Sequence, residues 1–205
     1  MPELNEDLHG NAPDNSTAAL LIIDMINALE FEDAGEMEAR AIEAARNVAA
    51  LKQRCREHGI PAIYANDNFG RWRSDFREVI DRVLKGDVRG RQIAEMLRPE
   101  RDDYFVLKPK HSAFFETTLE TLLRYLGVRR LIMTGIAGDI CVKLTASDAY
   151  MRDYEIYIPS DCTASLDPAE DEHMLAYVGR VLKADTTPST ELDLQALNAP
   201  LHEGR

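Results

Sequence analysis

Hydrophobic residues along the chain fall into two patterns, short continuous runs and longer stretches with helical spacing. Residues 18–23 read Ala-Ala-Leu-Leu-Ile-Ile, the pattern of a β-strand that is covered on both faces. Between residues 35 and 58, small and apolar side chains recur every three or four positions, and Gly59 follows as a helix stop. These patterns predict a buried first strand and an amphipathic helix after it.

The same alternation continues toward the C-terminus. Apolar runs predict further strands at residues 60–65, 104–107, 130–134 and 155–158, with a short sixth strand within 181–185. Helical patterns predict helices at 75–84, 88–97, 118–126, 140–152 and 168–182. Strands that alternate with helices form right-handed βαβ units and a parallel sheet. We therefore predict an α/β fold, a three-layer α/β/α, Rossmann-like domain whose mostly parallel sheet has about six strands.

The length and composition suit a single domain. The chain has 205 residues, of which 45% are hydrophobic and 29% charged, enough for one sizeable core. We divide it into a polar N-terminal extension (residues 1–17), a main domain (18–185) and a C-terminal extension (186–205). The last segment has two prolines and no clear period, so we expect it to pack on a neighbouring subunit or to stay loose.

Charge and cysteine usage narrow the functional class. The formal net charge of −12 argues against nucleic acid and anionic membrane surfaces as partners. Residues 1–17 lack the apolar run of a signal peptide, and no later segment is apolar enough to span a bilayer. Three widely spaced cysteines suit reduced thiols rather than disulfides. We expect a cytoplasmic protein.

Three reactive side chains lie at the ends of predicted strands. Asp24 follows the first strand, Lys108 the third, and Cys141 the turn after the fourth. Ligands of a doubly wound sheet bind at the carboxyl ends of its strands, so we expect these residues to meet there. Residues 131–142 read as a buried strand that turns sharply into a helix, whose free N–H groups and dipole favour a thiolate at Cys141.

An acid, an amine and a thiol at one sheet edge are suited to hydrolysis. The Lys108 ammonium would favour the Cys141 thiolate, while Asp24 would hold the lysine and carry a proton. The thiolate would attack a carbonyl carbon, and N–H groups of the 135–141 turn would receive the oxyanion. Asp24 would then protonate the leaving nitrogen. Cys55 and Cys162 are interpreted as structural residues.

Four motifs follow one another along the chain. They are Leu-Leu-Ile-Ile-Asp24-Met, Lys108-Pro-Lys-His-Ser112-Ala-Phe114, Thr134-Gly-Ile-Ala-Gly-Asp-Ile-Cys141-Val and Pro159-Ser-Asp161-Cys-Thr-Ala164. In these motifs the chain resembles the isochorismatase-like cysteine hydrolases, which include nicotinamidase, N-carbamoylsarcosine amidohydrolase and ureidoacrylate amidohydrolase. The similarity extends over roughly residues 18–185, nearly the whole main domain.

The resemblance implies a catalytic triad of Asp24, Lys108 and Cys141. It selects Lys108 over Lys110, because the family's catalytic lysine stands four residues before Ser-Ala-Phe. It also implies a cis peptide bond before Ala137, with the N–H groups of Ala137 and Cys141 as the oxyanion hole.

Further implications concern the substrate and the assembly. The family's pocket would bring Asn68, Phe69, Trp72 and Ile136 against a small-molecule substrate. Family members commonly assemble through their helical faces, so the resemblance implies a homo-oligomer, a dimer or a tetramer.

One loop departs from the pattern of nicotinamidases. Those enzymes place an aspartate and histidines after the second strand to hold a metal, whereas residues 66–74 read Asn-Asp-Asn-Phe-Gly-Arg-Trp-Arg-Ser here. We therefore predict an enzyme without metal or other cofactor, which argues against a classical nicotinamidase. Members that cleave the vinyl ether of isochorismate can lack the cysteine. The presence of Cys141 thus favours hydrolysis of a C–N bond in a small amide, ureide or carbamoyl compound.

Two alternatives remain open. A vinyl-ether hydrolase of the isochorismatase kind would use Asp24 to protonate its substrate, with Cys141 as a bystander. A non-catalytic binding or assembly protein could also keep this fold, because a fold does not fix a function.

Overall fold

Six parallel strands form one sheet at the centre of the molecule. The computed structural model describes residues 14–67 and 75–200 of the chain. The strands run in the order β3-β2-β1-β4-β5, and β6 pairs with β4. Their bounds are β1 Ala18–Ile23, β2 Ala62–Asp67, β3 Tyr104–Lys108, β4 Arg130–Ile136, β5 Glu155–Tyr157 and β6 Thr163–Ala164. The predicted α/β fold class with a parallel sheet is confirmed.

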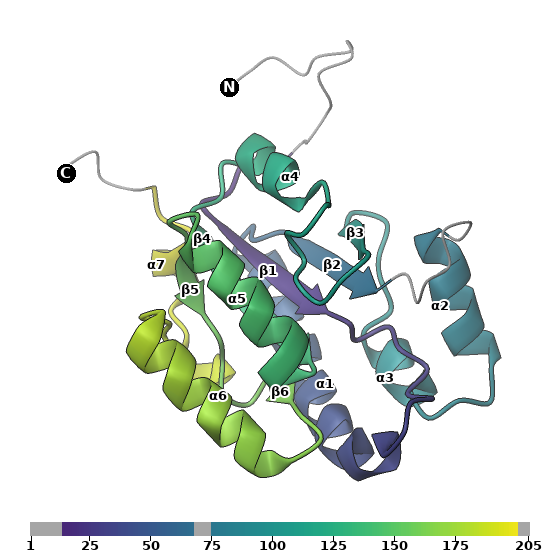
Figure 1. Cartoon of the computed structure of the whole chain (residues 1–205). Coiled ribbons are helices and arrows are strands. Elements are labelled where there is room, and N and C mark those ends of the chain that lie inside the picture. The colour runs from purple at the N-terminus through teal and green to yellow at the C-terminus, as the bar shows by residue number, and fades with distance from the viewer. Residues whose placement is uncertain (1–13, 68–74, 201–205) are drawn as a thin grey trace.

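Helices cover both faces of this sheet (Figure 1). One face carries α1 (Ala34–Glu57) and α3 (Arg91–Met96), and α2 (Phe76–Lys85) packs against α3 and β3. The other face carries α4 (Leu119–Leu126), α5 (Lys143–Tyr150) and α6 (Pro168–Val181). Short helical turns at Gly138–Val142 and Ser189–Glu191 and the helix α7 (Leu194–Leu197) complete the described elements. The result is the predicted three-layer arrangement.

The middle strand β1 supplies both halves of the core. All six of its residues are buried, and they alternate between the two faces of the sheet. Ala18, Leu20 and Ile22 pack in the layer with α1, whereas Ala19, Leu21 and Ile23 pack in the layer with α4, α5 and α6. A continuous apolar run is therefore what this position requires. The next residue, Asp24, lies at the carboxyl edge of the sheet.

Gly135 allows β1 and β4 to lie close together near this edge. It pairs with Ile23 and has a φ of 125°, a conformation that residues with a side chain rarely adopt. A Cβ atom at this position would lie 2.0 Å from the carbonyl oxygen of Ile23. The glycine thus lets the turn that carries Cys141 begin directly beside the end of β1.

The sixth strand differs from its prediction. Residues up to Val181 are helical, and Asp185 makes only a single bridge, to Tyr157. The sixth strand is instead Thr163–Ala164, which extends the sheet beside the end of β4. A two-residue strand is too short to produce a hydrophobic period, so the sequence pattern could not indicate it.

The described part of the C-terminal segment packs on its own chain, so the expectation that it would pack on a neighbour or stay loose is wrong there. Leu192, Leu194 and Leu197 are buried in the same cluster as α1. The Arg54 guanidinium of α1 donates hydrogen bonds to the carbonyl oxygens of Ser189 and Leu192, at 2.7 and 2.9 Å. Three leucines spaced over six residues had no helical or strand period to reveal this contact.

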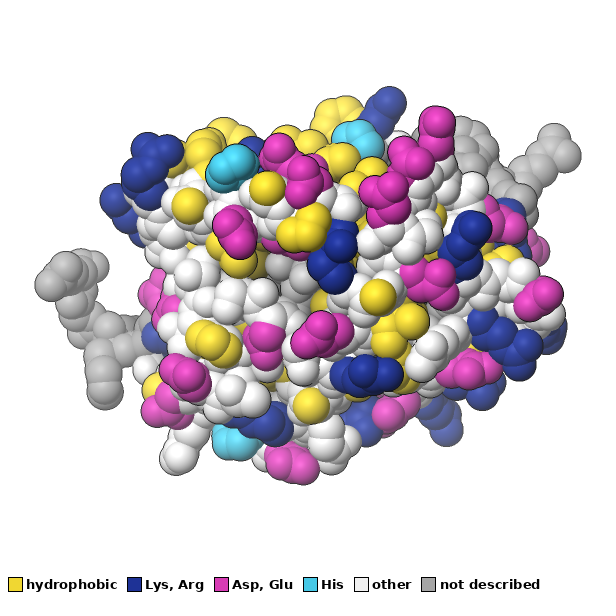
Figure 2. Space-filling view, turned by 90° about the horizontal axis from the view of Figure 1, so that it is seen from below, with side chains coloured by type: hydrophobic (Ala, Val, Ile, Leu, Met, Phe, Trp, Pro, Cys, Tyr) yellow, Lys and Arg dark blue, Asp and Glu magenta, His cyan; other side chains and the backbone are white. Residues whose placement is uncertain are grey.

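The surface carries charges of both signs. Figure 2 shows acidic and basic side chains interspersed over the face seen from below. In residues 14–67 and 75–200, no helix is both long and apolar enough to cross a membrane.

Candidate active site

Asp24, Lys108 and Cys141 meet at the carboxyl edge of the sheet. Asp24 follows β1, Lys108 is the last residue of β3, and Cys141 lies in the π-helical turn Gly138–Val142 after β4. Lys108 Nζ lies 2.7 Å from Asp24 Oδ2 and 3.6 Å from Cys141 Sγ. The structure therefore brings together the three residues that the sequence singles out.

Lys108 and Lys110 differ in their burial. Lys108 is fully buried and Asp24 is 4% exposed, whereas Lys110 is exposed. Lys110 contributes its backbone carbonyl, which accepts a hydrogen bond from Lys108 Nζ at 3.2 Å. Buried charges are tolerated when they are paired, and this ion pair satisfies that condition.

Backbone contacts fix the carboxylate of Asp24. Its Oδ1 accepts a hydrogen bond from the Asp67 N–H at 2.7 Å, and its own N–H donates to the carbonyl of Ala65 at 3.0 Å. Asp24 has a φ of 53°, in the left-handed region, which aspartate adopts more readily than most residues. In the register of β2 and β3, Asp67 lies opposite Lys108. The carboxylate is thus held between two neighbouring strand ends.

Burial and mutual attraction act against each other in the Asp24–Lys108 pair. Burial raises the pKa of Asp24, although Lys108 acts against this effect. Burial alone would lower the pKa of Lys108, but the charge of Asp24 and its hydrogen bond to the ammonium raise that pKa. Lys108 is therefore an ammonium ion at neutral pH.

Cys141 is a protonated thiol in the resting site. Burial and the Asp24 carboxylate raise the pKa of Cys141 to about 12, and the Lys108 ammonium only partly offsets them. Lys108 acts in the expected direction, because its charge lowers the pKa of Cys141, but burial and the Asp24 carboxylate leave the sulfur protonated in the resting state. Burial of the sulfur is the largest cause, and the charge of Lys108 cannot offset it because Lys108 is paired with Asp24.

The turn before Cys141 is held by Ser165, the residue after the fourth motif, which in turn bonds Asp171 of α6. The peptide bond between Ile136 and Ala137 is cis. Ser165 Oγ accepts a hydrogen bond from the Asp139 N–H at 3.0 Å and donates one to Asp171 Oδ1 at 2.7 Å. Ile136 is 2% exposed and packs in the cluster with α1, and its contact with a substrate stays a prediction. An oxyanion hole formed by Ala137 and Cys141 stays a prediction.

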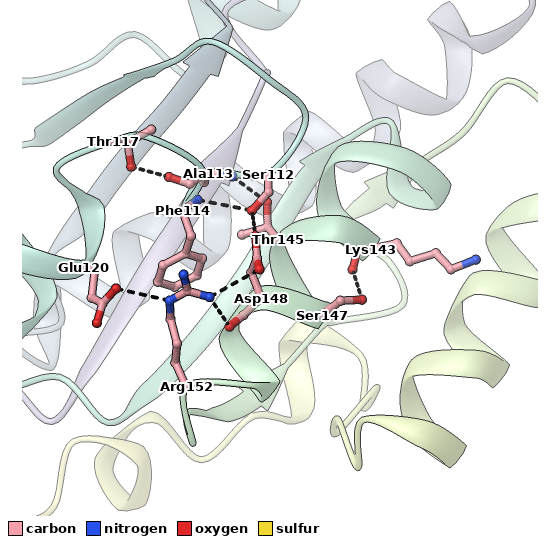
Figure 3. Close-up of polar contacts among 10 residues, drawn as sticks. All are labelled: Ser112, Ala113, Phe114, Thr117, Glu120, Lys143, Thr145, Ser147, Asp148 and Arg152. Carbon is pink, nitrogen blue, oxygen red and sulfur yellow. Dashed lines mark hydrogen bonds and ion pairs between the residues drawn. The ribbon is translucent and has the colours of Figure 1, made fainter.

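Hydrogen bonds join the Lys108 motif to the helix that follows Cys141 (Figure 3). Ser112 Oγ donates to Asp148 Oδ2 of α5 at 2.5 Å. The Ala113 N–H donates to Thr145 Oγ1 at 3.1 Å, and this hydroxyl donates to the Cys141 carbonyl at 2.7 Å. The serine and alanine of the motif thus fix the distance between the two catalytic candidates, Lys108 and Cys141.

His111 is a neighbour of the sulfur that the sequence did not single out. Its Nδ1 lies 3.7 Å from Cys141 Sγ, and its side chain is exposed. The five histidines of the chain are widely spaced and show no spacing usual for metal ligands, so the sequence gives His111 no role as a ligand. The available signal was the place of His111 in the Lys108 motif, one residue before the serine that bonds α5.

The remaining site predictions cannot be placed. Asn68, Phe69 and Trp72 lie outside the described residues. Within the described ranges, no group of three or more histidine, cysteine or acidic side chains is arranged to hold a metal ion.

Comparison with known proteins assigns the family. The isochorismatase domain matches residues 18–186. The isochorismatase family protein YaaI of Bacillus subtilis is 45% identical over 175 residues, which cover 85% of this chain and 95% of that protein. Enterobactin synthase component B of Escherichia coli is 31% identical over 207 residues, covering 90% of this chain and 68% of that protein.

A solved structure extends the comparison. The N-carbamoylsarcosine amidase of Thermoplasma acidophilum superposes with a TM-score of 0.67 and 27% identity, over 86% of this chain and 99% of that one. The chain belongs to the isochorismatase-like hydrolase family, which covers amidases and isochorismatase.

Proposed function

We propose that the chain is a metal-independent cysteine hydrolase that cleaves a C–N bond of a small amide, ureide or carbamoyl compound. The observation that supports this most is the contact of Cys141 with a buried Asp24–Lys108 pair, at 3.6 Å from Lys108 Nζ. A thiol next to a buried carboxylate has both a nucleophilic atom and a proton acceptor. The similarity to a solved N-carbamoylsarcosine amidase supports the same type of bond.

The first half of the reaction forms an acyl-enzyme. When a substrate carbonyl lies against Cys141, Asp24 takes the proton of the thiol and the sulfur attacks the carbonyl carbon. The N–H groups of Ala137 and Cys141 are the proposed donors to the oxyanion. The C–N bond then breaks as Asp24 transfers its proton to the leaving nitrogen. The leaving amine or ammonia departs, and a thioester remains on Cys141.

The second half of the reaction releases the acid. Asp24, again a carboxylate, takes a proton from a water molecule whose oxygen attacks the thioester carbon. The C–S bond breaks and Asp24 returns the proton to the sulfur. Throughout, Lys108 keeps its charge and holds the carboxylate in place through their 2.7 Å ion pair. The net change is the addition of one water across the C–N bond.

Substitutions at the site test this proposal. Parent and variants are supplied with a panel of amides, ureides and carbamoyl compounds, and released ammonia is measured. Cys141→Ala and Asp24→Ala should each lose at least about a thousandfold in turnover, because both half-reactions need both groups. Cys55→Ala removes a buried core thiol outside the site and is the matched control, expected to retain turnover.

The same variants separate the alternatives. If Asp24→Ala is inactive on a vinyl ether while Cys141→Ala keeps full activity, the protein is a hydrolase of the isochorismatase kind. If no compound acylates Cys141 and none is hydrolysed, a binding or assembly protein is the better description.

A further inference from the structure

Cys141 has polar neighbours of two different kinds. The Asp24–Lys108 pair is buried, with exposures of 4% and 0%. The imidazole of His111, in contrast, is exposed, and its Nδ1 lies 3.7 Å from Sγ. The sulfur therefore contacts a buried ion pair, whose two charges compensate each other, and also an exposed imidazole that is not part of this pair.

Lys108 alone is a weak partner for a sulfur anion. Its ammonium group has three N–H bonds, and its partners in the described part of the chain are Asp24 Oδ2 at 2.7 Å, the Lys110 carbonyl at 3.2 Å and Cys141 Sγ at 3.6 Å. The contact to sulfur is the longest of the three. A thiolate formed here would gain from a second donor that is not shared with the carboxylate.

The position of His111 is fixed on both sides along the chain. Lys108 binds the Lys110 carbonyl on the N-terminal side. On the C-terminal side, Ser112 binds Asp148 at 2.5 Å, a contact drawn in Figure 3. Asp148 lies on α5, the helix that continues from the turn with Cys141. The contact between His111 and the sulfur is therefore held by the same bonds that hold the motif to α5.

We propose that His111 is a catalytic residue that donates a hydrogen bond from Nδ1–H to Cys141 Sγ as the proton of the thiol passes to Asp24. The proton moves from sulfur to the carboxylate oxygen, and His111 neither gains nor loses one. Its N–H stabilises the negative charge that the sulfur acquires before it attacks. This role rests on the proposed function, because both involve Cys141 as the nucleophile.

Alkylation of Cys141 by iodoacetamide tests this role without any substrate. The rate at pH 8 is followed by peptide mass spectrometry for the parent, His111→Phe and His111→Gln. His111→Phe removes the donor and should slow alkylation about tenfold or more, the usual effect of losing a hydrogen bond to a charged group. His111→Gln keeps an N–H donor and should stay within about threefold of the parent.

A second exposed histidine provides the control. His58 lies at the end of α1, where its Nδ1 contacts the Arg54 carbonyl at 2.9 Å. His58→Phe should alkylate at the parent rate, and circular dichroism should show the same fold for all variants. The proposal is overturned if His111→Phe alkylates like the parent, or if His111→Gln is slowed as much as His111→Phe.

A failure of the proposed function and a failure of the contact between His111 and the sulfur can be told apart. If no amide, ureide or carbamoyl compound acylates Cys141, the proposed function fails, yet the alkylation rates still decide the role of His111. If acylation occurs but His111→Phe alkylates normally, the hydrolase proposal stands and the histidine has no role at the sulfur.

Discussion

The carboxylate of Asp24 has two opposite effects on Cys141. Burial and, after it, the negative charge of Asp24 keep the sulfur protonated and raise the pKa of Cys141 to about 12. The same carboxylate is the acceptor to which the thiol proton can pass, because the two side chains share a hydrogen bond. A resting thiol that is ionised only during attack is protected from nonspecific alkylation and oxidation.

The pH dependence of alkylation follows from this raised pKa. An ordinary cysteine has a pKa of 9.0, and its alkylation rate reaches a plateau when the pH is above that value. Cys141 has a pKa of about 12, so its alkylation rate should continue to rise through pH 9 and 10. The pKa is raised on folding, so the thiol contributes stability that is complete below pH 9.0 and is lost as the pH rises toward about 12. Peptide mass spectrometry after iodoacetamide measures the rates, and a plateau near pH 9 would contradict this assignment.

Substitution of Asp24 should have opposite effects on the alkylation rate of Cys141 and on turnover. In Asp24→Asn the Lys108 charge is no longer compensated, so the pKa of Cys141 falls and alkylation at pH 8 becomes faster than in the parent. Turnover is lost, because an amide cannot carry the proton. Lys108→Ala removes the cation and should slow alkylation. Slower alkylation of Asp24→Asn, in a variant that circular dichroism shows to be folded, would contradict the assigned role of the carboxylate.

The sequence predicted which residues form the site better than it predicted their protonation. Asp24, Lys108 and Cys141 each follow a strand within a recognisable motif, so their meeting point could be inferred. The protonation of Cys141 could not, because it depends on burial and on the pairing of Lys108 in three dimensions. His111 was missed for a similar reason: a lone histidine has no periodicity, and its contact with the sulfur exists only in the fold.

Between elements, the motif at residues 108–114 is bound to α5 through Ser112 and Asp148 (Figure 3). Asp148 is also held by Arg152, which contacts its Oδ1 at 3.2 Å and Glu120 Oε2 at the same distance. The strand end with Lys108 and the turn with Cys141 come from distant parts of the chain. Their relative placement depends on this connection.

Ser112→Ala should therefore affect both stability and catalysis. Loss of a hydrogen bond to a charged partner should lower the free energy of unfolding by about 1.5–3 kcal/mol and reduce kcat. Ser147→Ala is the matched control on the same helix, because its Oγ donates to the Lys143 carbonyl one turn away at 2.9 Å. Chemical denaturation and steady-state kinetics measure the two effects. Equal behaviour of both variants would remove Ser112 from this positioning role.

The predictability of an element depended on its length. β1 and β4 are long and buried, and their apolar runs indicated both strands. The two-residue β6 and the π-helical turn at Gly138–Val142 left no pattern of their own. Such short elements are determined by tertiary contacts, such as the pairing of Gly135 with Thr163.

For the whole molecule, the assembly state remains a prediction. Several large apolar side chains on one helical layer are exposed, among them Tyr125 of α4 and Leu144 and Tyr150 of α5, at 52%, 44% and 44%. Their burial in an interface would stabilise a dimer or tetramer. Multi-angle light scattering of the full chain should give a mass of two or four subunits, and a monomer at micromolar concentration would contradict this.

The most direct test of the central claim is the mass of the protein during turnover. The parent and Cys141→Ala are mixed with a hydrolysed amide, quenched in acid within the first turnovers and analysed as intact chains. The parent should carry an adduct with the mass of the acyl part of the substrate, located on the peptide that contains Cys141, and Cys141→Ala should carry none. Undiminished ammonia release by Cys141→Ala would contradict an acyl-enzyme on this cysteine.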